Sequence, residues 1–279
     1  TKAALGARYT PESNVDLPIR QNFLAFARDK NLQKQLDHWF IRVTEEGRSA
    51  IIYIRNADSS GSDPYSEILS VSIKEITGML GQGPFGPEEK YPLESWLSAA
   101  EGCMAIAREA LNWVYSLPTT KPDKNGMGPV QLARYYIYKL VDALYDITSE
   151  LSSTSWQIAN DKAVLLQGPA GIGKSHLLAD IVECQVHAGY PALLVLGSTF
   201  NDNEPWRQIL NQLDRPATEQ IKHFLGSMDS AAHAIGVRAL ICIDALNERN
   251  GVDIWPHHLA AFLKLVESFP RIGVIISCS

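Results

Sequence analysis

The residues with the clearest chemistry form one run of eight just past the middle of the chain. Residues 168–175 read Gly-Pro-Ala-Gly-Ile-Gly-Lys-Ser and satisfy the pattern Gly-x-x-x-x-Gly-Lys-Ser at every fixed position. Glycines let such a loop turn tightly and direct its backbone N–H groups toward phosphate oxygens. Lys174 can supply a positive charge to the β- and γ-phosphates, and the Ser175 hydroxyl can bind Mg²⁺. The pattern predicts a site for a nucleoside triphosphate with Mg²⁺.

A second chemical signal follows about seventy residues later. Residues 239–244 are an apolar run that ends in Asp244, which at the end of a neighbouring strand could hold Mg²⁺. Glu248 could polarise an attacking water as a general base, or could simply be a solvated carboxylate before the next helix. Ser277 and Ser279, at the end of the last predicted strand, are candidates for sensing the γ-phosphate.

The predicted site divides by role. The expected nucleotide-binding residues are Gly168, Pro169, Ala170, Gly171, Ile172, Gly173, Lys174, Ser175 and His176. Lys174 and Glu248 are expected to be catalytic, Ser175 and Asp244 to bind the metal, and ATP and Mg²⁺ to be the cofactors. Because Glu248 is the only residue that argues for turnover, a scaffold that holds nucleotide without hydrolysing it stays an open alternative.

The elements around these residues alternate between strands and helices. Predicted strands cover 163–167, 191–196, 239–243 and 273–277, and predicted helices cover 173–188, 204–213, 219–235 and 254–268. Continuous apolar strands separated by helices are typical of a parallel sheet covered on both faces. We therefore expect an α/β fold of three layers, as in P-loop NTPases. Since the chain stops directly after a buried strand, we expect this sheet to be incomplete at its C-terminal end.

The region before the P-loop is less regular. Apolar residues at helical spacing predict a helix over 19–39, and short β-rich runs at 40–43 and 50–54 flank the turn-like residues 45–48. A helix followed by a hairpin is the prediction. Four glycines and two prolines within 78–87 indicate a loop. This part is expected to be mostly helical α+β.

Two long helices are predicted before the α/β region. They cover 93–117 and 129–151, and the Pro- and Gly-rich stretch 119–128 connects them as an antiparallel pair. Tyrosines recur at helical spacing in the second helix, and we interpret them as packing against the first helix rather than as a base-stacking surface. The expected domains are 1–92 (leader and small α+β region), 93–155 (helical pair) and 156–279 (truncated P-loop NTPase core).

Composition limits the classes of partner. The chain has 279 residues, 46% of them hydrophobic, and a net charge of -6, which gives no overall attraction to nucleic acid or to an anionic membrane. No apolar run approaches the roughly 18 residues of a membrane span. The four cysteines are scattered without a Cys-x-x-Cys pair, and the seven histidines lack metal-ligand spacing. We expect a cytoplasmic protein without direct nucleic-acid or membrane binding.

The motifs together resemble a known class of signalling ATPases. Gly-Pro-Ala-Gly-Ile-Gly-Lys-Ser, Ile-Asp-Ala-Leu-Asn-Glu and Val-Ile-Ile-Ser-Cys-Ser are similar to the corresponding segments of STAND-class P-loop NTPases. The version Asp-Ala-Leu-Asn-Glu, with a leader over residues 5–19, resembles the bacterial antiviral branch called AVAST. In that class, a nucleotide-binding module is followed by a helical or winged-helix domain and a large repeat sensor, with an effector at the N terminus.

The resemblance implies a switch. ATP would favour an open, self-associating state and ADP a closed monomer, with slow, regulatory hydrolysis. It also implies an antiviral sensor that responds to a protein trigger through a C-terminal region missing from this chain. One alternative is a P-loop kinase-like enzyme, but 155 residues precede the motif region and the sequence lacks an arginine-rich lid. The other is a nucleic-acid-dependent ATPase, which would need a basic stripe.

Overall fold

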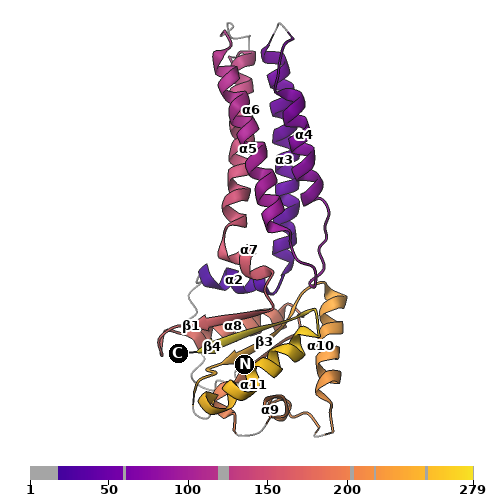
Figure 1. The fold of residues 1–279 in the computed structure, drawn as a ribbon, viewed down its shortest axis with the longest axis vertical. Helices are drawn as coiled ribbons and strands as arrows, with labels where there is room; N and C mark the ends of the chain where they lie inside the picture. The colour runs from indigo at the N-terminus through magenta and orange to yellow at the C-terminus, as the bar shows by residue number, and fades with distance from the viewer. Residues whose placement is uncertain are drawn as a thin grey trace. The chain divides into compact units, whose positions relative to one another are not determined.

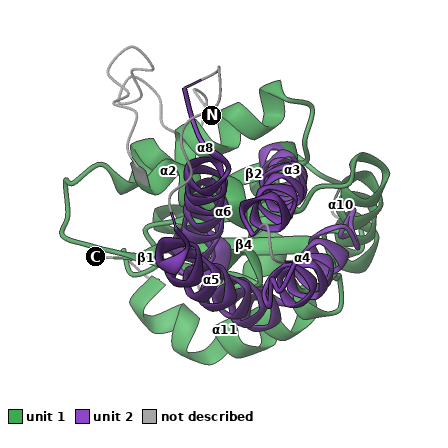
Figure 2. Cartoon of the chain, turned by 90° about the horizontal axis from the view of Figure 1, so that it is seen from above, with its two compact units in different colours: residues 1–30, 86–90, 158–279 green, residues 31–85, 91–157 purple. Residues whose placement is uncertain are grey.

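The chain divides into two compact units, which are described one at a time. The structure, a computed structural model, describes residues 18–58, 61–118, 126–201, 204–216, 218–248 and 251–278. One unit comprises residues 1–30, 86–90 and 158–279 and contains the sheet, whereas the other comprises residues 31–85 and 91–157 and is built from long helices (Figures 1 and 2). Residues 5–17 of the leader and Ser279 lie outside the described residues.

The sheet consists of four parallel strands. They are β1 (Ala163–Gln167), β2 (Ala192–Leu196), β3 (Ala239–Asp244) and β4 (Ile272–Cys278), in the spatial order β1-β4-β3-β2. Figure 1 labels β1, β4 and β3. β3 and β4 are central and almost fully buried. β1 stands at one end of this order, and its Leu165 side chain is 59% exposed.

Helices cover both faces of the sheet. Phe23 and Phe26 of α2 (Pro18–Phe26) and Ile181 of α8 (Lys174–His187) pack on the face that carries Leu240 and Cys242. The opposite face packs against α9 (Pro205–Gln212), α10 (Ile221–Ile235) and α11 (Gly251–Glu267). The short 3₁₀ helix η3 (Gly197–Thr199) follows β2. Successive side chains of each strand point to opposite faces of the sheet, so the strands contribute to two separate apolar cores.

The expected α/β architecture with a parallel sheet is confirmed. Every predicted strand lies within one residue of the observed one at each end, because these runs are apolar throughout and short enough to read as buried strands. The four helices that separate the strands are also present, with ends that differ from the prediction by three residues at most.

Buried arginines form hydrogen bonds with backbone carbonyl groups at the amino-terminal edge of this sheet. Arg238, which directly precedes β3, is 1% exposed and donates to the carbonyl oxygens of Phe26, Ala159 and Asp161 at 2.8–3.0 Å. Arg28 donates from Nε to the same Ala159 oxygen at 3.0 Å. Two buried guanidinium groups therefore bind segments that are more than a hundred residues apart in the sequence.

A third arginine extends this edge. Arg271 precedes β4 and forms ion pairs with Asp229 of α10 at 2.9 Å and with Glu88 at 2.8 Å. Lys162 precedes β1 and donates to the carbonyl of Pro270. Burial, followed by repulsion from the neighbouring guanidinium groups, lowers the pKa of Lys162 from 10.5 to about 8.

The second unit is built from helices. Its long helices are α3 (Lys30–Ala57), α4 (Ser66–Leu80), α5 (Leu93–Ser116) and α6 (Pro129–Leu151), and the short α7 (Thr154–Ala159) follows them in the chain (Figure 1). The rings of Trp39, Tyr91, Trp96 and Trp156 cluster with centroids 5.0–6.1 Å apart. This aromatic cluster forms one part of the helical core.

The predicted hairpin is wrong, because α3 runs without interruption through residues 40–54. Its buried residues Leu32, Leu36, Trp39, Val43, Gly47, Ala50 and Ile54 recur every three or four positions, which is the helical period. Gly47, interpreted from the sequence as part of a turn, lies in the middle of the helix. A Cβ atom there would lie 2.6 Å from Cδ1 of Ile73 in α4, so the glycine allows close helix packing. The described residues before 93 contain no strand.

The two long helices predicted at 93–117 and 129–151 are confirmed as α5 and α6, which pack against each other. The predicted role of the α6 tyrosines is only partly right. Tyr138 meets α5 through its hydroxyl, 3.0 Å from that of Tyr115, whereas Tyr136 stacks on Tyr53 of α3 at 4.6 Å. Tyr135 and Tyr145 are exposed.

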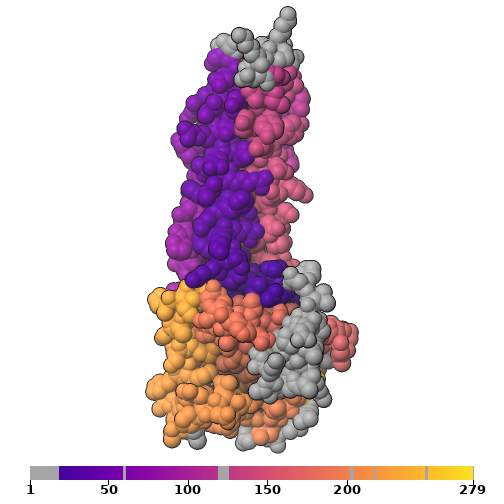
Figure 3. Space-filling view, turned by 180° about the vertical axis from the view of Figure 1, so that it is seen from behind, coloured from indigo at the N-terminus to yellow at the C-terminus, as the bar shows by residue number. Residues whose placement is uncertain are grey.

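Ion pairs also connect α3 with α6, which lie side by side in Figure 3 as the indigo and pink columns. Arg42 of α3 pairs with Asp142, at 2.8 Å, and with Asp146, both one turn apart on α6. These carboxylates raise the pKa of Arg42. No helix among the described residues combines the length and apolarity that a membrane span requires.

Candidate nucleotide-binding site

The glycine-rich run forms the turn between β1 and α8. β1 ends at Gln167 and α8 begins at Lys174, so the loop links a strand end to a helix N-terminus. Gly171 and Gly173 have φ angles of 84° and 97°, in the left-handed region that side chains other than glycine rarely adopt. The glycines at these two positions are therefore a requirement of the backbone.

The first turn of α8 carries donors suited to an anion. Gly173 is the N-cap residue, so the N–H groups of Lys174, Ser175 and His176 lie in the turn where backbone amides have no intrahelical acceptor. The helix dipole adds a partial positive charge at the same end. A phosphate group at this turn would meet several converging N–H donors.

Lys174 is held inside the loop. Its side chain is 9% exposed, and Nζ donates to the carbonyl oxygens of Gly168 at 2.5 Å and Pro169 at 2.9 Å. Both acceptors belong to the first turn of the loop itself. Both acceptors are neutral carbonyl groups, and an anionic phosphate oxygen would accept a stronger, charge-assisted hydrogen bond from this ammonium.

Asp244 lies at the end of β3 and is buried, with 6% of its surface exposed. Its Oδ1 accepts a hydrogen bond of 2.7 Å from Oγ of Ser277, which is fully buried in β4. The same Oγ accepts from the N–H of Ala245 at 2.8 Å, and the Ser277 carbonyl accepts from the N–H of Leu246 at 2.8 Å. One serine thus fixes both the carboxylate and the chain that leaves β3.

The turn after β3 is tightly constrained. Ala245 has a φ of 57°, an uncommon value for a residue with a side chain. A Cβ atom on Gly197, which follows β2, would lie 2.7 Å from the carbonyl oxygen of Asp244 and 2.5 Å from that of Ala245. The turn is therefore held on one side by hydrogen bonds to Ser277 of β4 and packs closely on the other side against Gly197, which follows β2.

Strand register places the loop and the carboxylate at the same level. Leu166 of β1 pairs with Ser277 of β4, and Ile243 of β3 pairs with Ile276. The strands run parallel, so the turn after β1 and Asp244 leave from the same edge of the sheet, with β4 between them. Strands lie about 4.8 Å apart, so β1 and β3 are separated by about 10 Å. A phosphate group bound at the loop and a metal ion bound at Asp244 would therefore lie on the same side of the β4 end, close enough to share one ligand.

Glu248 also lies at this edge. Its N–H donates to the Ala245 carbonyl at 3.2 Å, and its side chain is exposed. The carboxylate is therefore accessible to water, and its role as a general base stays a prediction. The hydroxyl of Ser277 donates to Asp244, and the role of this serine as a γ-phosphate sensor stays a prediction.

Some contributors to this edge were missed from the sequence. Gly197 was not singled out, although a glycine directly after an apolar strand is a signal for close backbone approach. The bond between Ser277 and Asp244 was not foreseen, because sequence patterns place both at strand ends without indicating that their strands are neighbours.

No protein-family model, curated protein or solved structure matches this chain. The chemistry of the site therefore follows from its own residues and their arrangement.

Proposed function

We propose that this chain binds ATP with Mg²⁺ and hydrolyses it, acting as the nucleotide switch of a STAND-type signalling protein. The observation that supports the proposal best is the shared sheet edge. The run 168–175 joins β1 to α8 at that edge. The buried carboxylate of Asp244 lies at the same edge, at the end of β3, with β4 between β3 and β1. A phosphate-binding loop and a metal-binding carboxylate need this relationship in order to act on one ligand.

The nucleotide phosphates would be bound by the loop and the first turn of α8. Lys174 would exchange its two carbonyl acceptors for oxygens of the β- and γ-phosphates. The amides of the first helical turn would donate to the same anion. Since the loop already holds the ammonium in place, little side-chain entropy is lost on binding.

The arrangement also suits Mg²⁺, which prefers oxygen ligands and usually retains several waters. Asp244 accepts one hydrogen bond from Ser277 at Oδ1, and an ionised carboxylate has about four lone-pair sites, so acceptor capacity remains. Asp244 and the hydroxyl of Ser175 would hold the metal, which would supply positive charge to the phosphate oxygens.

Hydrolysis requires a group that orients water, and we assign this role to the carboxylate of Glu248. The clamped turn after β3 carries Glu248 out of the sheet at the edge where the phosphates would lie. An exposed carboxylate is accessible to water and can accept a hydrogen bond from it. Turnover is expected to be slow, since a regulatory switch depends on how long each nucleotide stays bound.

The signalling part of the proposal rests on the resemblance of the motifs to STAND proteins. In that setting, ATP would favour a self-associating state, a protein trigger would act through another region, and the output would be antiviral. Each nucleotide can shift the equilibrium only by its difference in affinity for the two states. Mass measurements with ATP and with ADP would therefore report the switch directly.

An ATP titration in the presence of Mg²⁺ tests the binding site. Lys174→Ala should lose most of its ATP affinity and retain the circular dichroism spectrum and unfolding midpoint of the wild type. Lys222→Ala removes an exposed lysine from α10 and serves as the matched control, with unchanged affinity. Equal ATP binding by the wild type and Lys174→Ala would refute the assignment.

A further inference from the structure

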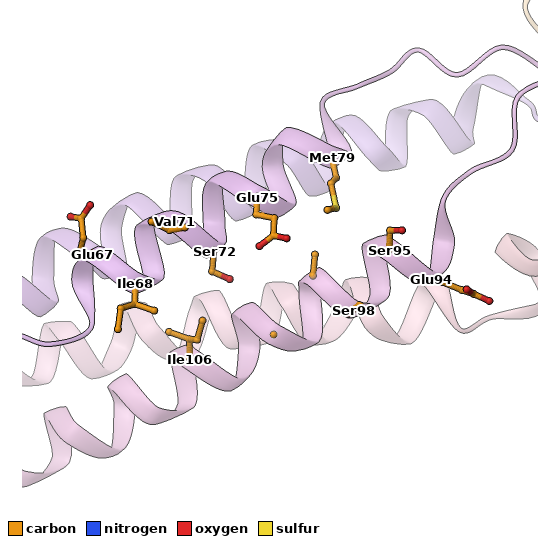
Figure 4. Close-up of a pocket in the computed structure, with 12 residues that line it drawn as sticks. Glu67, Ile68, Val71, Ser72, Glu75, Met79, Glu94, Ser95, Ser98 and Ile106 are labelled. Carbon is orange, nitrogen blue, oxygen red and sulfur yellow. The ribbon is translucent and has the colours of Figure 1, made fainter.

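The helical unit contains a groove that takes no part in the proposed nucleotide chemistry. It lies between α4 and α5 and has a volume of about 830 Å³ (Figure 4). Residues 67–79 of α4 form one wall and residues 94–106 of α5 form the other. Each wall is thirteen residues long, so the groove extends for about 18 Å at 1.5 Å per residue.

The groove exposes apolar side chains along the α4 wall, and mostly small ones along the α5 wall. Ile68 and Val71 of α4 are 53% and 59% exposed. Ile68 points toward Ile106 at one end, and Met79 points toward α5 at the other (Figure 4). The α5 wall carries Ser95, Ser98, Ala99 and Gly102. Apolar side chains facing small ones leave space in which a third helix can approach closely.

Gly102 marks the open floor of this groove. A Cβ atom at Gly102 would meet no atom within 4 Å, so space begins directly at the helix backbone. A glycine inside a helix is unfavourable by roughly 0.5–1 kcal/mol relative to alanine. Glycine at position 102 therefore lowers the stability of the helix slightly, and it leaves the groove deeper than alanine would.

The charged residues that line the groove are all acidic. Glu67, Glu75 and Glu94 line it, and no lysine, arginine or histidine is among its lining residues. Arg55 lies 3.6 Å from Glu67 and compensates one end in part. Glu75 lies midway along the groove and points into it (Figure 4). A cationic partner would relieve the repulsion among these carboxylates.

We propose that this groove binds an amphipathic helix of a partner protein, with an apolar stripe flanked by lysine or arginine. The length of the walls suits about three turns of helix. The apolar stripe would cover Ile68, Val71 and Met79, and the cationic flanks would face the three glutamates. Such helix-in-groove recognition uses anchors at positions i, i+3, i+4 and i+7. The groove belongs to the helical unit alone and needs no nucleotide.

The test uses two stapled helical peptides of about 14 residues and the whole chain. Both carry leucines at i, i+3, i+4, i+7 and i+11; one has lysines beside this stripe and the other has glutamates. We expect the lysine peptide to bind at least about tenfold more tightly, the scale of three partly exposed charge pairs. No binding of the lysine peptide, or equal binding of the two peptides, would overturn the proposal.

Two glycine variants provide the matched control. Gly102→Leu fills the groove and should lower the affinity of the chain for the lysine peptide at least about tenfold. Gly78→Leu should leave this affinity unchanged. Gly78 also lies in a helix with no atom within 4 Å of an added Cβ, yet it does not line the groove. Unchanged binding by Gly102→Leu contradicts the assigned site.

The charge variant and the mass of the free chain complete the test. Replacing Glu67, Glu75 and Glu94 by glutamine should bring the two peptides to within about threefold of each other. A chain that dimerises without peptide, and whose dimer is lost in Gly102→Leu, would show that a second copy fills the groove. That result would overturn the assignment to a cationic partner helix.

Discussion

Ser277, fully buried in β4, donates a hydrogen bond of 2.7 Å to Oδ1 of Asp244 at the end of β3. The same hydroxyl accepts from the backbone of Ala245 at 2.8 Å. The serine therefore links the orientation of a carboxylate to the geometry of the turn behind it. This relationship makes β4 part of the candidate site, although β4 contributes no residue to the glycine-rich loop.

Ser277→Ala should lower the free energy of unfolding by about 1–3 kcal/mol, because it leaves a buried carboxylate oxygen and a backbone N–H without their partner. Urea denaturation of the whole chain measures the change. Ser268→Ala removes an exposed hydroxyl that donates to the Leu265 carbonyl, and its free energy of unfolding should stay within about 0.5 kcal/mol of the wild type. Similar losses in both variants would show that the bond to Asp244 adds no stability.

Two glycines should respond to alanine with opposite signs. Gly173 has a φ of 97°, so Gly173→Ala should destabilise the chain by about 1–2 kcal/mol and reduce ATP binding. Gly102 lies in regular helix with open space around it, so Gly102→Ala should stabilise by roughly 0.5–1 kcal/mol. Thermal unfolding of the two variants beside the wild type measures both shifts. Stabilisation by Gly173→Ala would contradict the strained geometry of the loop.

Glu248→Gln separates binding from turnover. The substitution leaves Lys174 and Asp244 in place, so ATP affinity with Mg²⁺ should stay within about twofold, whereas hydrolysis should slow at least about a hundredfold, the usual scale for a general base. Single-turnover hydrolysis at saturating ATP, measured beside a titration on the same preparation, gives both values. Undiminished hydrolysis would assign water positioning to another group.

The lowered pKa of Lys162 predicts a pH dependence of stability. Arg238 and Arg28 repel its ammonium, Asp229 and Glu88 attract it weakly, and burial is the largest effect. Between pH 8 and 10.5 the unfolded chain holds this proton and the folded chain does not, so this residue makes stability rise with pH. Urea unfolding of wild type and Lys162→Met across this range should show a steeper rise in the wild type. Parallel pH profiles would exclude this effect.

The sheet was predictable because its strands are continuous apolar runs. Residues 239–243 contain no polar side chain, and such a run between turn signals has few competing interpretations. The order of the strands was not predictable from these runs. It depends on how the connections cross the sheet, and the bond between Ser277 and Asp244 depends on that order.

The wrong prediction of a hairpin at residues 40–54 has a different physical cause. Isoleucine and valine favour strands locally, and Gly47 after two glutamates resembles a turn. In the folded chain, packing decides instead, because Gly47 lets Ile73 of α4 approach the backbone of α3. A glycine selected for close helix contact cannot be told from a turn glycine without its neighbour. The buried arginines escaped prediction for the same reason, since their acceptors are carbonyl groups of distant segments.

Among the strands that the structure describes, β1 occupies one end of the sheet and presents the half-exposed side chain of Leu165. An apolar strand at a sheet edge offers backbone donors and acceptors to any extended chain that meets it. Preparations of this polypeptide should therefore lose solubility with rising concentration, through intermolecular strand pairing. A lysine in place of Leu165 would put a charge at that edge, the means by which many natural sheets avoid aggregation.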